Sequence, residues 1–366
     1  MPGSAFYKIG NQISKWLSVV DECNINSSTK LISDRLPDIE LDEESELISF
    51  DMTSLYTNVP LNEAIQDCTE LLYSGRYHKP PVDRQTFIEL VSLCSCNVVL
   101  LTNDGFYRQV DGLAMGSPPA PQLENDWMSK FDERIKGNST LYSRYMDDIL
   151  RDIKKNQMDS KLDEINNLHL SLKFTVEREK NLSISFLDME NHQTQERLTS
   201  TWYTKPTDTD LMMNFYAMAP VRYKRSVVSG LIHRIFRSCS NWINFHEILN
   251  KGKTLLENNQ YPKSFYDPII SNTLTKILEK TESADARDKE KEEEEETKMI
   301  FLAYRGKVSE KFESLLRKIK APVKVVFVLK KLKTLLPSLK PNVEKPYKSG
   351  VVYKIECPRC KACYVG

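Results

Sequence analysis

Asp147 and Asp148 stand side by side in the run RYMDDIL, among residues that are otherwise mostly aromatic or apolar. Two carboxylates this close disfavour joint ionisation unless a cation neutralises them. Hard divalent ions such as Mg²⁺ suit that task, because they take oxygen ligands and retain some of their waters. Most Asp-Asp pairs are simple turn residues, so the pair alone indicates either a turn or a metal site.

A third carboxylate favours the metal site over the simple turn. Asp51 directly follows the run ELISF (46–50), which is typical of a short strand. Three carboxylates can hold two metal ions about 4 Å apart, which activate an attacking 3′-hydroxyl and stabilise a leaving pyrophosphate. The run GLAMGSP (112–118) lies between Asp51 and the aspartate pair and leads into an expected helix. This order of elements favours the metal site.

Apolar patterning and turn residues predict the first elements that position these groups. Residues 1–45 are only weakly patterned. Pro60 suits the first position of a helix that stops at Gly75, and a second helix is expected over 80–96. A hairpin should follow, with its turn at 103–105.

The later elements follow from the same patterns. Ser117 and Pro118 suit the start of a helix that continues to Gly137. RYMDDIL should lie in a second hairpin, where the strict alternation of side chains on a strand is relaxed. More strands are expected up to about residue 206, and the chain from Pro220 to about Lys280 is expected to be helical.

Length and composition limit the protein class. The 366 residues leave room for two or three domains at about 150 residues each. Lys and Arg (51) balance Asp and Glu (51), so the whole chain shows no general preference for nucleic acid. Eight cysteines are too few for a disulfide scaffold of this length. With neither a signal-peptide core nor an apolar run of about 18 residues, we expect a soluble intracellular protein.

The zero net charge hides two charged segments. Residues 281–298 are highly charged, contain a run of glutamates and lack large apolar side chains, which is typical of a solvated linker or an exposed helix. Residues 299–348 hold thirteen Lys or Arg against three Asp or Glu, a net charge of +10. That charge could neutralise phosphates, or it could belong to a solvated helix that balances the acidic run. The sequence favours neither use.

FDMTSLYTNVP, DGLAMGSPPAP and YMDDIL resemble motifs A, B and C of reverse transcriptases, in the form found in Penelope-like retroelements. The resemblance runs from about residue 46 to the C-terminus. It implies an α+β fold, a right-hand polymerase palm in which helices pack on an antiparallel sheet, with incomplete fingers and a helical thumb. The expected domains are partial fingers (1–45), palm (46–215), thumb (216–280), acidic linker (281–298), basic connector (299–349) and the start of a GIY-YIG endonuclease (350–366).

The resemblance also implies roles for single residues. Asp51, Asp147 and Asp148 match the catalytic triad that binds two Mg²⁺. Tyr56 matches an aromatic steric gate that excludes a 2′-hydroxyl, although a packed aromatic would look the same in sequence. The motif B residues expected to contact the nucleotide, which could equally form an ordinary helix start, are Gly112, Met115, Gly116, Ser117 and Pro118.

The remaining assignments are less specific. Lys173 in LKFTVE could protonate pyrophosphate or contact phosphate, but a lysine on a strand is usually just solvated. Trp202 and Tyr203 could belong to a primer grip or to the core. The implied partners are an RNA template, a DNA primer and dNTPs, with no membrane, and the nucleus is the expected site of action.

The C-terminal residues resemble the first two strands of a GIY-YIG nuclease, with Tyr353 and Tyr364 at matching spacing. The catalytic arginine and glutamate of that nuclease do not follow, so we expect no nuclease activity. Cys357 and Cys360 form a C-x₂-C pair that could supply half of a zinc site.

The resemblance thus predicts an RNA-directed DNA polymerase of a Penelope-like element. The alternatives are a catalytically dead remnant that binds nucleic acid and, with less support, a telomerase-like polymerase.

Overall fold

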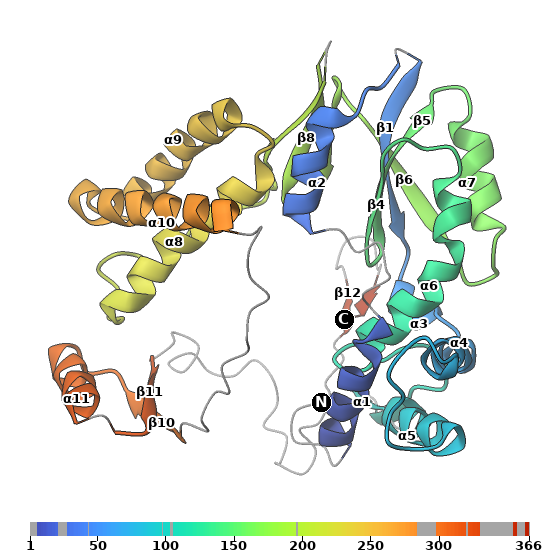
Figure 1. Cartoon of the computed structure of the whole chain (residues 1–366), viewed down its shortest axis with the longest axis horizontal. Coiled ribbons are helices and arrows are strands. Elements are labelled where there is room, and N and C mark those ends of the chain that lie inside the picture. Colours follow the sequence, from blue (N-terminus) through green and yellow to red (C-terminus); the bar gives the residue numbers. More distant parts are fainter. Residues whose placement is uncertain are drawn as a thin grey trace. The chain divides into compact units, whose positions relative to one another are not determined.

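The computed structural model describes residues 6–20, 28–42, 44–96, 98–102, 105–194, 197–283, 298–319, 321–329, 354–356 and 363–365. The chain divides into two compact units (Figure 1). The first comprises residues 1–187, 192–198 and 342–366, and the second comprises residues 188–191 and 199–341.

A four-stranded antiparallel sheet forms the centre of the first unit, in the order β4-β5-β1-β6. The strands are β1 (Ser45–Met52), β4 (Tyr142–Tyr145), β5 (Asp148–Lys154) and β6 (Phe174–Arg178). β1 is a central strand, and Leu47, Ile48 and Phe50 on it are fully buried. Apolar side chains at successive positions are typical of a strand that is covered on both faces.

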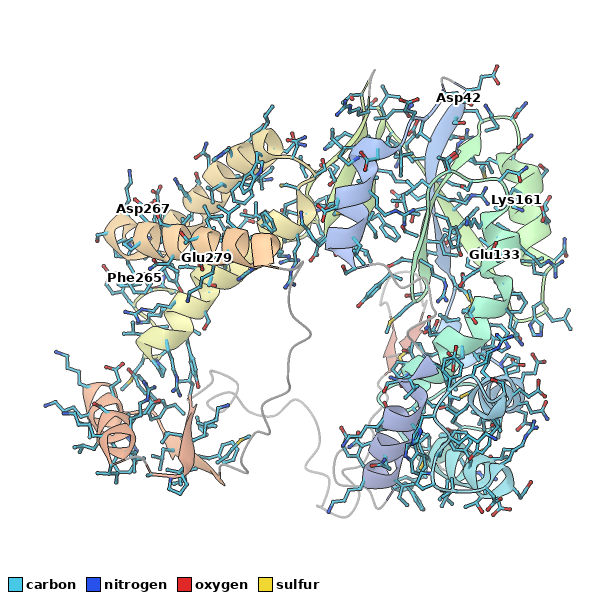
Figure 2. All side chains as sticks on the ribbon, in the orientation of Figure 1. Asp42, Glu133, Lys161, Phe265, Asp267 and Glu279 are labelled. Carbon is cyan, nitrogen blue, oxygen red and sulfur yellow. The ribbon has the colours of Figure 1, made fainter. Side chains whose placement is uncertain are left out.

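The helices of the first unit are α1 (Tyr7–Leu17), α2 (Thr29–Arg35), η2 (Leu36–Asp38), α3 (Leu55–Asn58), α4 (Leu61–Tyr73), α5 (Arg84–Cys96), α6 (Ala120–Lys136) and α7 (Met158–Asn166). Buried residues of α1 and of α3 to α7 share one apolar core with residues of the sheet. On α6, the fully buried Leu123, Trp127 and Ile135 recur at helical spacing, which fixes the face that this helix turns to the core. Glu133 on the same helix is exposed and projects away from the ribbon (Figure 2).

Three smaller sheets contain β2 and β3, β7 to β9, and β12 and β13. A hairpin joins β2 (Val99–Thr102) to β3 (Gly105–Arg108). The strands β7 (Ser183–Phe186), β8 (Met189–Gln193) and β9 (Leu198–Trp202) form a three-stranded sheet. β12 (Lys354–Glu356) pairs antiparallel with β13 (Cys363–Val365).

Three helices dominate the second unit, namely α8 (Val221–Ser238), α9 (Trp242–Asn258) and α10 (Lys263–Ser283). Ile232 and Ile235 of α8 pack with Phe245 and Leu256 of α9 and with Tyr266 of α10 in one apolar core. The side chain of Asn241 accepts a hydrogen bond from the Asn244 amide at 2.8 Å and caps α9. No helix in the described ranges combines the length and the apolar character needed to cross a bilayer.

The basic segment contains a βαβ unit. β10 (Lys298–Ala303) pairs parallel with β11 (Val323–Val328), and α11 (Lys307–Lys318) connects them. The sequence had offered a solvated helix as one interpretation of this segment. The helix is present, but it is the crossover between two strands.

Both predicted hairpins are confirmed, since β2 pairs with β3 and β4 with β5. The start predicted for the motif B helix is wrong, because α6 begins at Ala120. Ser117 precedes Pro118, and the residue before a proline is disfavoured in the helical region. In the structure Pro119 is the N-cap of α6, and Pro121 lies in its first turn, where the missing N–H costs no helical hydrogen bond.

Replacing glycine by alanine should have opposite effects on stability at two helical positions of the second unit. A Cβ at the exposed Gly230 of α8 would meet nothing within 4 Å, whereas a Cβ at the buried Gly252 of α9 would lie 2.7 Å from Ile235 Cδ1. We expect Gly230→Ala to raise the free energy of unfolding by about 0.5–1 kcal/mol through helix propensity. We expect Gly252→Ala to lower it by about 1 kcal/mol through overpacking. Urea unfolding measures both, and changes of the same sign would contradict the packing described here.

Candidate active site

The three predicted aspartates meet at one end of the palm sheet. Asp51, near the end of β1, is paired directly with Asp148, the first residue of β5. Met146 and Asp147 form the turn between β4 and β5, where Met146 has a positive φ of 54°. The amide of Met52 donates a hydrogen bond to the carbonyl oxygen of Asp147 at 3.2 Å, which ties this turn to β1.

The aspartates influence one another electrostatically. Burial raises the pKa of the Asp147 carboxyl, and the negative charge of Asp51 raises it further. Like charges directly opposite each other on neighbouring strands are destabilising, and Asp51 and Asp148 have that relation. The fold therefore concentrates negative charge at this end of the sheet.

The donor set fits hard divalent cations, because all three side chains offer only carboxylate oxygens. Among the described residues, no group of three or more His, Cys, Asp or Glu side chains is arranged so that it could hold a metal ion. The register thus brings the aspartates together at one place but does not close them around an ion. Cys357 and Cys360 lie outside the described residues.

Tyr56 and motif B are joined through the backbone. The amide of Leu113 donates a hydrogen bond to the Tyr56 carbonyl oxygen at 2.6 Å. Gly112 has a φ of +81°, and a Cβ on it would lie 2.6 Å from the carbonyl oxygen of Thr57. Only glycine fits this close approach, so motif B is held against the short helix α3 that carries Tyr56.

A cleft of about 440 Å³ opens beside Tyr56. Four of the five predicted motif B residues line it, namely Met115, Gly116, Ser117 and Pro118. Gly112 instead lies against α3. Burial raises the pKa of Tyr56 to about 12, with further contributions from the charges of Glu124 and Asp147, so its phenol stays neutral.

The cleft also contains residues that the sequence interpretation missed. Tyr7, Asn11 and Ser14 of α1 line it. The Ser14 hydroxyl lies 3.2 Å from Gln122 Oε1 and links α1 to α6. These three residues are four and then three positions apart, so their polar side chains lie on one face of the helix. This spacing could have been recognised in the sequence.

Lys173 lies near the same end of the sheet, and its side chain is exposed. Its carbonyl oxygen accepts a hydrogen bond from the amide of Thr53 at 2.9 Å, two residues after Asp51. Trp202 is buried in the core of the second unit. Tyr353 lies outside the described residues, and Tyr364 lies on β13, where it pairs with Ile355.

Residues 10–201, more than half of the chain, match the family described as reverse transcriptase (RNA-dependent DNA polymerase). The chain belongs to the reverse transcriptase family. The match begins in α1 and ends in β9. Residues 211–271 match the animal helix-turn-helix domain, which covers α8, α9 and part of α10. The fold of this reverse transcriptase is an α+β right-hand palm with a helical thumb.

Several solved polymerases have similar structures. A Candida albicans telomerase, in complex with a fragment of telomeric RNA, has 13% identity and a TM-score of 0.48, and the match covers 76% of this chain and 53% of that one. Apo telomerase from Candida tropicalis has 12% identity and a TM-score of 0.43, with 78% and 52% covered.

A sicinivirus RNA-dependent RNA polymerase has 10% identity and a TM-score of 0.38, with 64% and 52% covered. The chain thus spans about half the length of each of these three structures. No curated protein matches the sequence.

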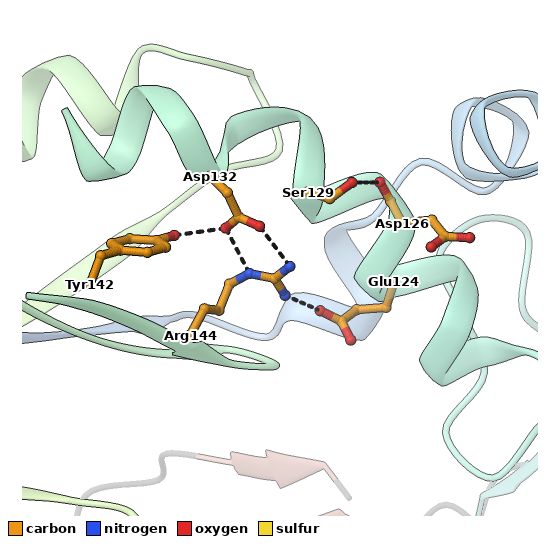
Figure 3. Close-up of polar contacts among 6 residues, drawn as sticks. All are labelled: Glu124, Asp126, Ser129, Asp132, Tyr142 and Arg144. Atoms are coloured by element: carbon orange, nitrogen blue, oxygen red, sulfur yellow. Dashed lines mark hydrogen bonds and ion pairs between the residues drawn. The ribbon is translucent and has the colours of Figure 1, made fainter. Parts of the chain in front are cut away.

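A buried ionic cluster holds the β4–β5 hairpin of this reverse transcriptase against α6 (Figure 3). Arg144 on β4 is 0% exposed. Its guanidinium donates two hydrogen bonds to Asp132 of α6, at 2.7 and 2.9 Å, and lies 3.9 Å from Glu124. The Tyr142 hydroxyl donates to the same Asp132 carboxylate at 2.7 Å. The strand that leads into the aspartate turn is therefore fixed to the helix that follows motif B.

The charge of Arg144 is retained on burial. Burial alone lowers the pKa of Arg144, but its hydrogen bonds to Asp132 and the charge of that carboxylate raise it above the usual value. Burial, followed by the charge of Asp132, raises the pKa of Tyr142. Arg144 is thus a cation two residues before the turn at Met146 and Asp147.

Removing one partner from this cluster should be costly. Arg144→Met leaves the carboxylates of Asp132 and Glu124 buried without their cation, and we expect a loss of about 3–5 kcal/mol in the free energy of unfolding. Adding Asp132→Leu should cost less than the sum of the two single changes, because fewer charges remain uncompensated. Urea unfolding of the wild type, both single variants and the double variant gives the coupling free energy between Arg144 and Asp132. Strictly additive losses would contradict an interaction between the two side chains.

Divalent cations should stabilise the palm. An ion that binds the folded state adds about 2.7 kcal/mol when its free concentration is about 100 times its Kd. We expect Mg²⁺ to raise the unfolding temperature of the wild type and to have little effect on Asp51→Asn. Asp163→Asn, on the exposed face of α7, serves as the matched control and should keep the full response. If Mg²⁺ raised the unfolding temperature of Asp51→Asn as much as that of the wild type, the ion would bind at another place.

Proposed function

We propose that this chain is an RNA-directed DNA polymerase, which extends a DNA primer with deoxynucleotides on an RNA template. The observation that carries the proposal is the convergence of Asp51, Asp147 and Asp148 at one end of the sheet in a domain of the reverse transcriptase family. Membership of the family supplies the reaction class, and the register of the strands supplies its acidic residues.

The roles of the chain's own residues follow from their positions. Asp51, Asp147 and Asp148 would hold two Mg²⁺, which when bound activate the primer 3′-hydroxyl for in-line attack on the α-phosphate and stabilise the leaving pyrophosphate. The cleft beside Tyr56 would orient the incoming nucleotide and its template base. The exposed Lys173 side chain, near the end of β1, would contact phosphate.

The charge of α8 supports a primer and template as partners. This helix holds Arg222, Lys224, Arg225, Arg234 and Arg237 and no acidic residue, although Arg222 and Arg234 form ion pairs with Glu313 and Asp188. It falls within the helix-turn-helix match. A helix with this charge can neutralise phosphates of a bound duplex, and its contribution to binding should weaken with added salt.

The finer assignment is to a Penelope-like retroelement that acts on DNA in the nucleus, and it rests on the sequence motifs. The antiparallel pairing of β12 with β13 agrees with the first two strands of a GIY-YIG nuclease. A zinc ion at Cys357 and Cys360 stays a prediction, because these residues lie outside the described ranges.

A retroelement remnant that binds nucleic acid without polymerising it is the competing function. The observation that favours it is the open arrangement of the aspartates, which in the described part of the chain are not placed to hold an ion. Such a protein would bind RNA–DNA hybrid in a salt-dependent manner and would incorporate no nucleotide.

Primer extension on an RNA template decides between the two functions. With dNTPs and Mg²⁺, we expect the wild type and Asp163→Ala to extend a DNA primer. The double variant Asp147→Ala/Asp148→Ala should lose at least about a thousandfold in rate, because metal stabilisation of the transition state amounts to several kcal/mol. Equal extension by wild type and double variant would contradict the proposed site. Hybrid binding without any extension by the wild type would support the remnant.

Tyr56 should act on sugar selection. If its ring lies under the deoxyribose, Tyr56→Ala removes the clash with a 2′-hydroxyl, and incorporation of ribonucleotides relative to deoxynucleotides should rise by about tenfold or more. Tyr56→Phe keeps the ring and should preserve the wild-type preference. Single-nucleotide kcat/KM values for dATP and ATP measure the ratio. An unchanged ratio in Tyr56→Ala would make Tyr56 a packing residue.

A further inference from the structure

Within the described residues, the β10–α11–β11 unit leaves one face of its two-stranded sheet open. The parallel register pairs Met299 with Lys324, Phe301 with Val326 and Ala303 with Val328, so these side chains share a face. Met299 is 61% exposed and Phe301 is 65% exposed. Large apolar side chains gathered on an exposed face are typical of an interaction surface.

The opposite face of this sheet is packed. Val325 and Phe327 are buried there. The ring of Phe327 meets Tyr304 at a centroid distance of 5.4 Å, and the guanidinium of Arg222 lies 5.0 Å from the Phe327 ring. Arg222 also donates a hydrogen bond to the Val325 carbonyl oxygen at 3.2 Å. The core of the unit therefore lies on this side and does not use the face that carries Phe301.

The charge of the unit indicates what the open face can bind. Residues 298–329 hold eight Lys or Arg and two Asp or Glu. Both acids have internal partners, since Glu310 accepts a hydrogen bond from the Tyr304 hydroxyl at 2.8 Å and Glu313 pairs with Arg222 and Arg317. The positive charge that remains includes the exposed Lys324 on the open face itself. The complementary partner is a polyanion.

We propose that the open face of β10 and β11 binds single-stranded nucleic acid. Phe301 offers an exposed ring on which a base can stack, and Met299 and Val328 extend the apolar surface around it. Lys324 lies where it can neutralise a phosphate. Exposed aromatic rings combined with positive charge suit single strands, because every base has a π-face and no base edge needs to be read. This surface goes beyond the proposed polymerase function and uses none of its residues.

Photocrosslinking of the full chain tests this surface directly. The probe is a single-stranded RNA of about 12 nucleotides that carries 5-iodouridine, a base that crosslinks to aromatic side chains on which it stacks. After irradiation, mass spectrometry of peptides should find an adduct at Phe301. Adducts in the first unit alone would overturn the proposal.

Phe312 provides the matched control, because it is also exposed, at 44%, but lies on α11. Phe301→Ala should abolish the β10 adduct and weaken binding of the RNA about tenfold, whereas Phe312→Ala should change neither. Lys324→Glu should weaken binding and reduce its dependence on salt. Equal effects of Phe301→Ala and Phe312→Ala would overturn the proposal. The proposal would also be overturned if the chain self-associates through this face. In that case Phe301→Ala would abolish self-association and leave the crosslinking of RNA to the rest of the chain unchanged.

The result is separable from the polymerase proposal. Asp147→Ala/Asp148→Ala should lose primer extension and keep the Phe301 adduct. A wild type that does not extend primers but gives the adduct would overturn the polymerase alone. A wild type that extends primers without an adduct at Phe301 would overturn the binding surface alone.

Discussion

The antiparallel register between β1 and β5 is the constraint on which the site depends. It sets Asp51 opposite Asp148, and the turn after β4 adds Asp147 beside them. A strand slipped by one residue would turn every side chain to the other face. Leu47, Ile48 and Phe50 are buried on both faces of β1, so such a slip would exchange their faces and break their packing. Packing of β1 therefore fixes the register and places the carboxylates. Their mutual repulsion is tolerated because the apolar part of the strand outweighs it.

Two further sets of contacts hold the surroundings of the aspartates. Arg144 fixes β4 to α6 through Asp132, inside the core where water cannot compete. Gly112 lets motif B approach α3, and the hydrogen bond from Leu113 to Tyr56 joins the two segments. Tyr56 is thereby positioned within electrostatic reach of Asp147. The acidic turn, the cleft and α6 thus form one connected structure.

Sequence patterns predicted most of the fold, since strands, hairpins and the helical thumb follow from local periodicity and turn residues. The aspartates were predictable because each stands at the end of a strand signal. The role of Arg144 was not predictable, because its partners Asp132 and Glu124 stand 12 and 20 residues earlier and meet it only after the helix packs on the sheet. The βαβ unit was missed for a related reason, because its basic composition concealed two short strands whose pairing is non-local.

We propose that Asp51 and the aspartate pair, distant in sequence, form one metal-binding site. Backbone cleavage by Fe²⁺ substituted for Mg²⁺ tests it most directly, because the hydroxyl radicals that a bound iron generates with ascorbate and peroxide cut only the chain near the ion. If the three aspartates bind one ion together, cuts should appear near both Asp51 and Asp147, should be suppressed together by excess Mg²⁺, and should be lost together in Asp51→Asn. Cuts near only one of the two segments, or cuts that persist in Asp51→Asn, would contradict it.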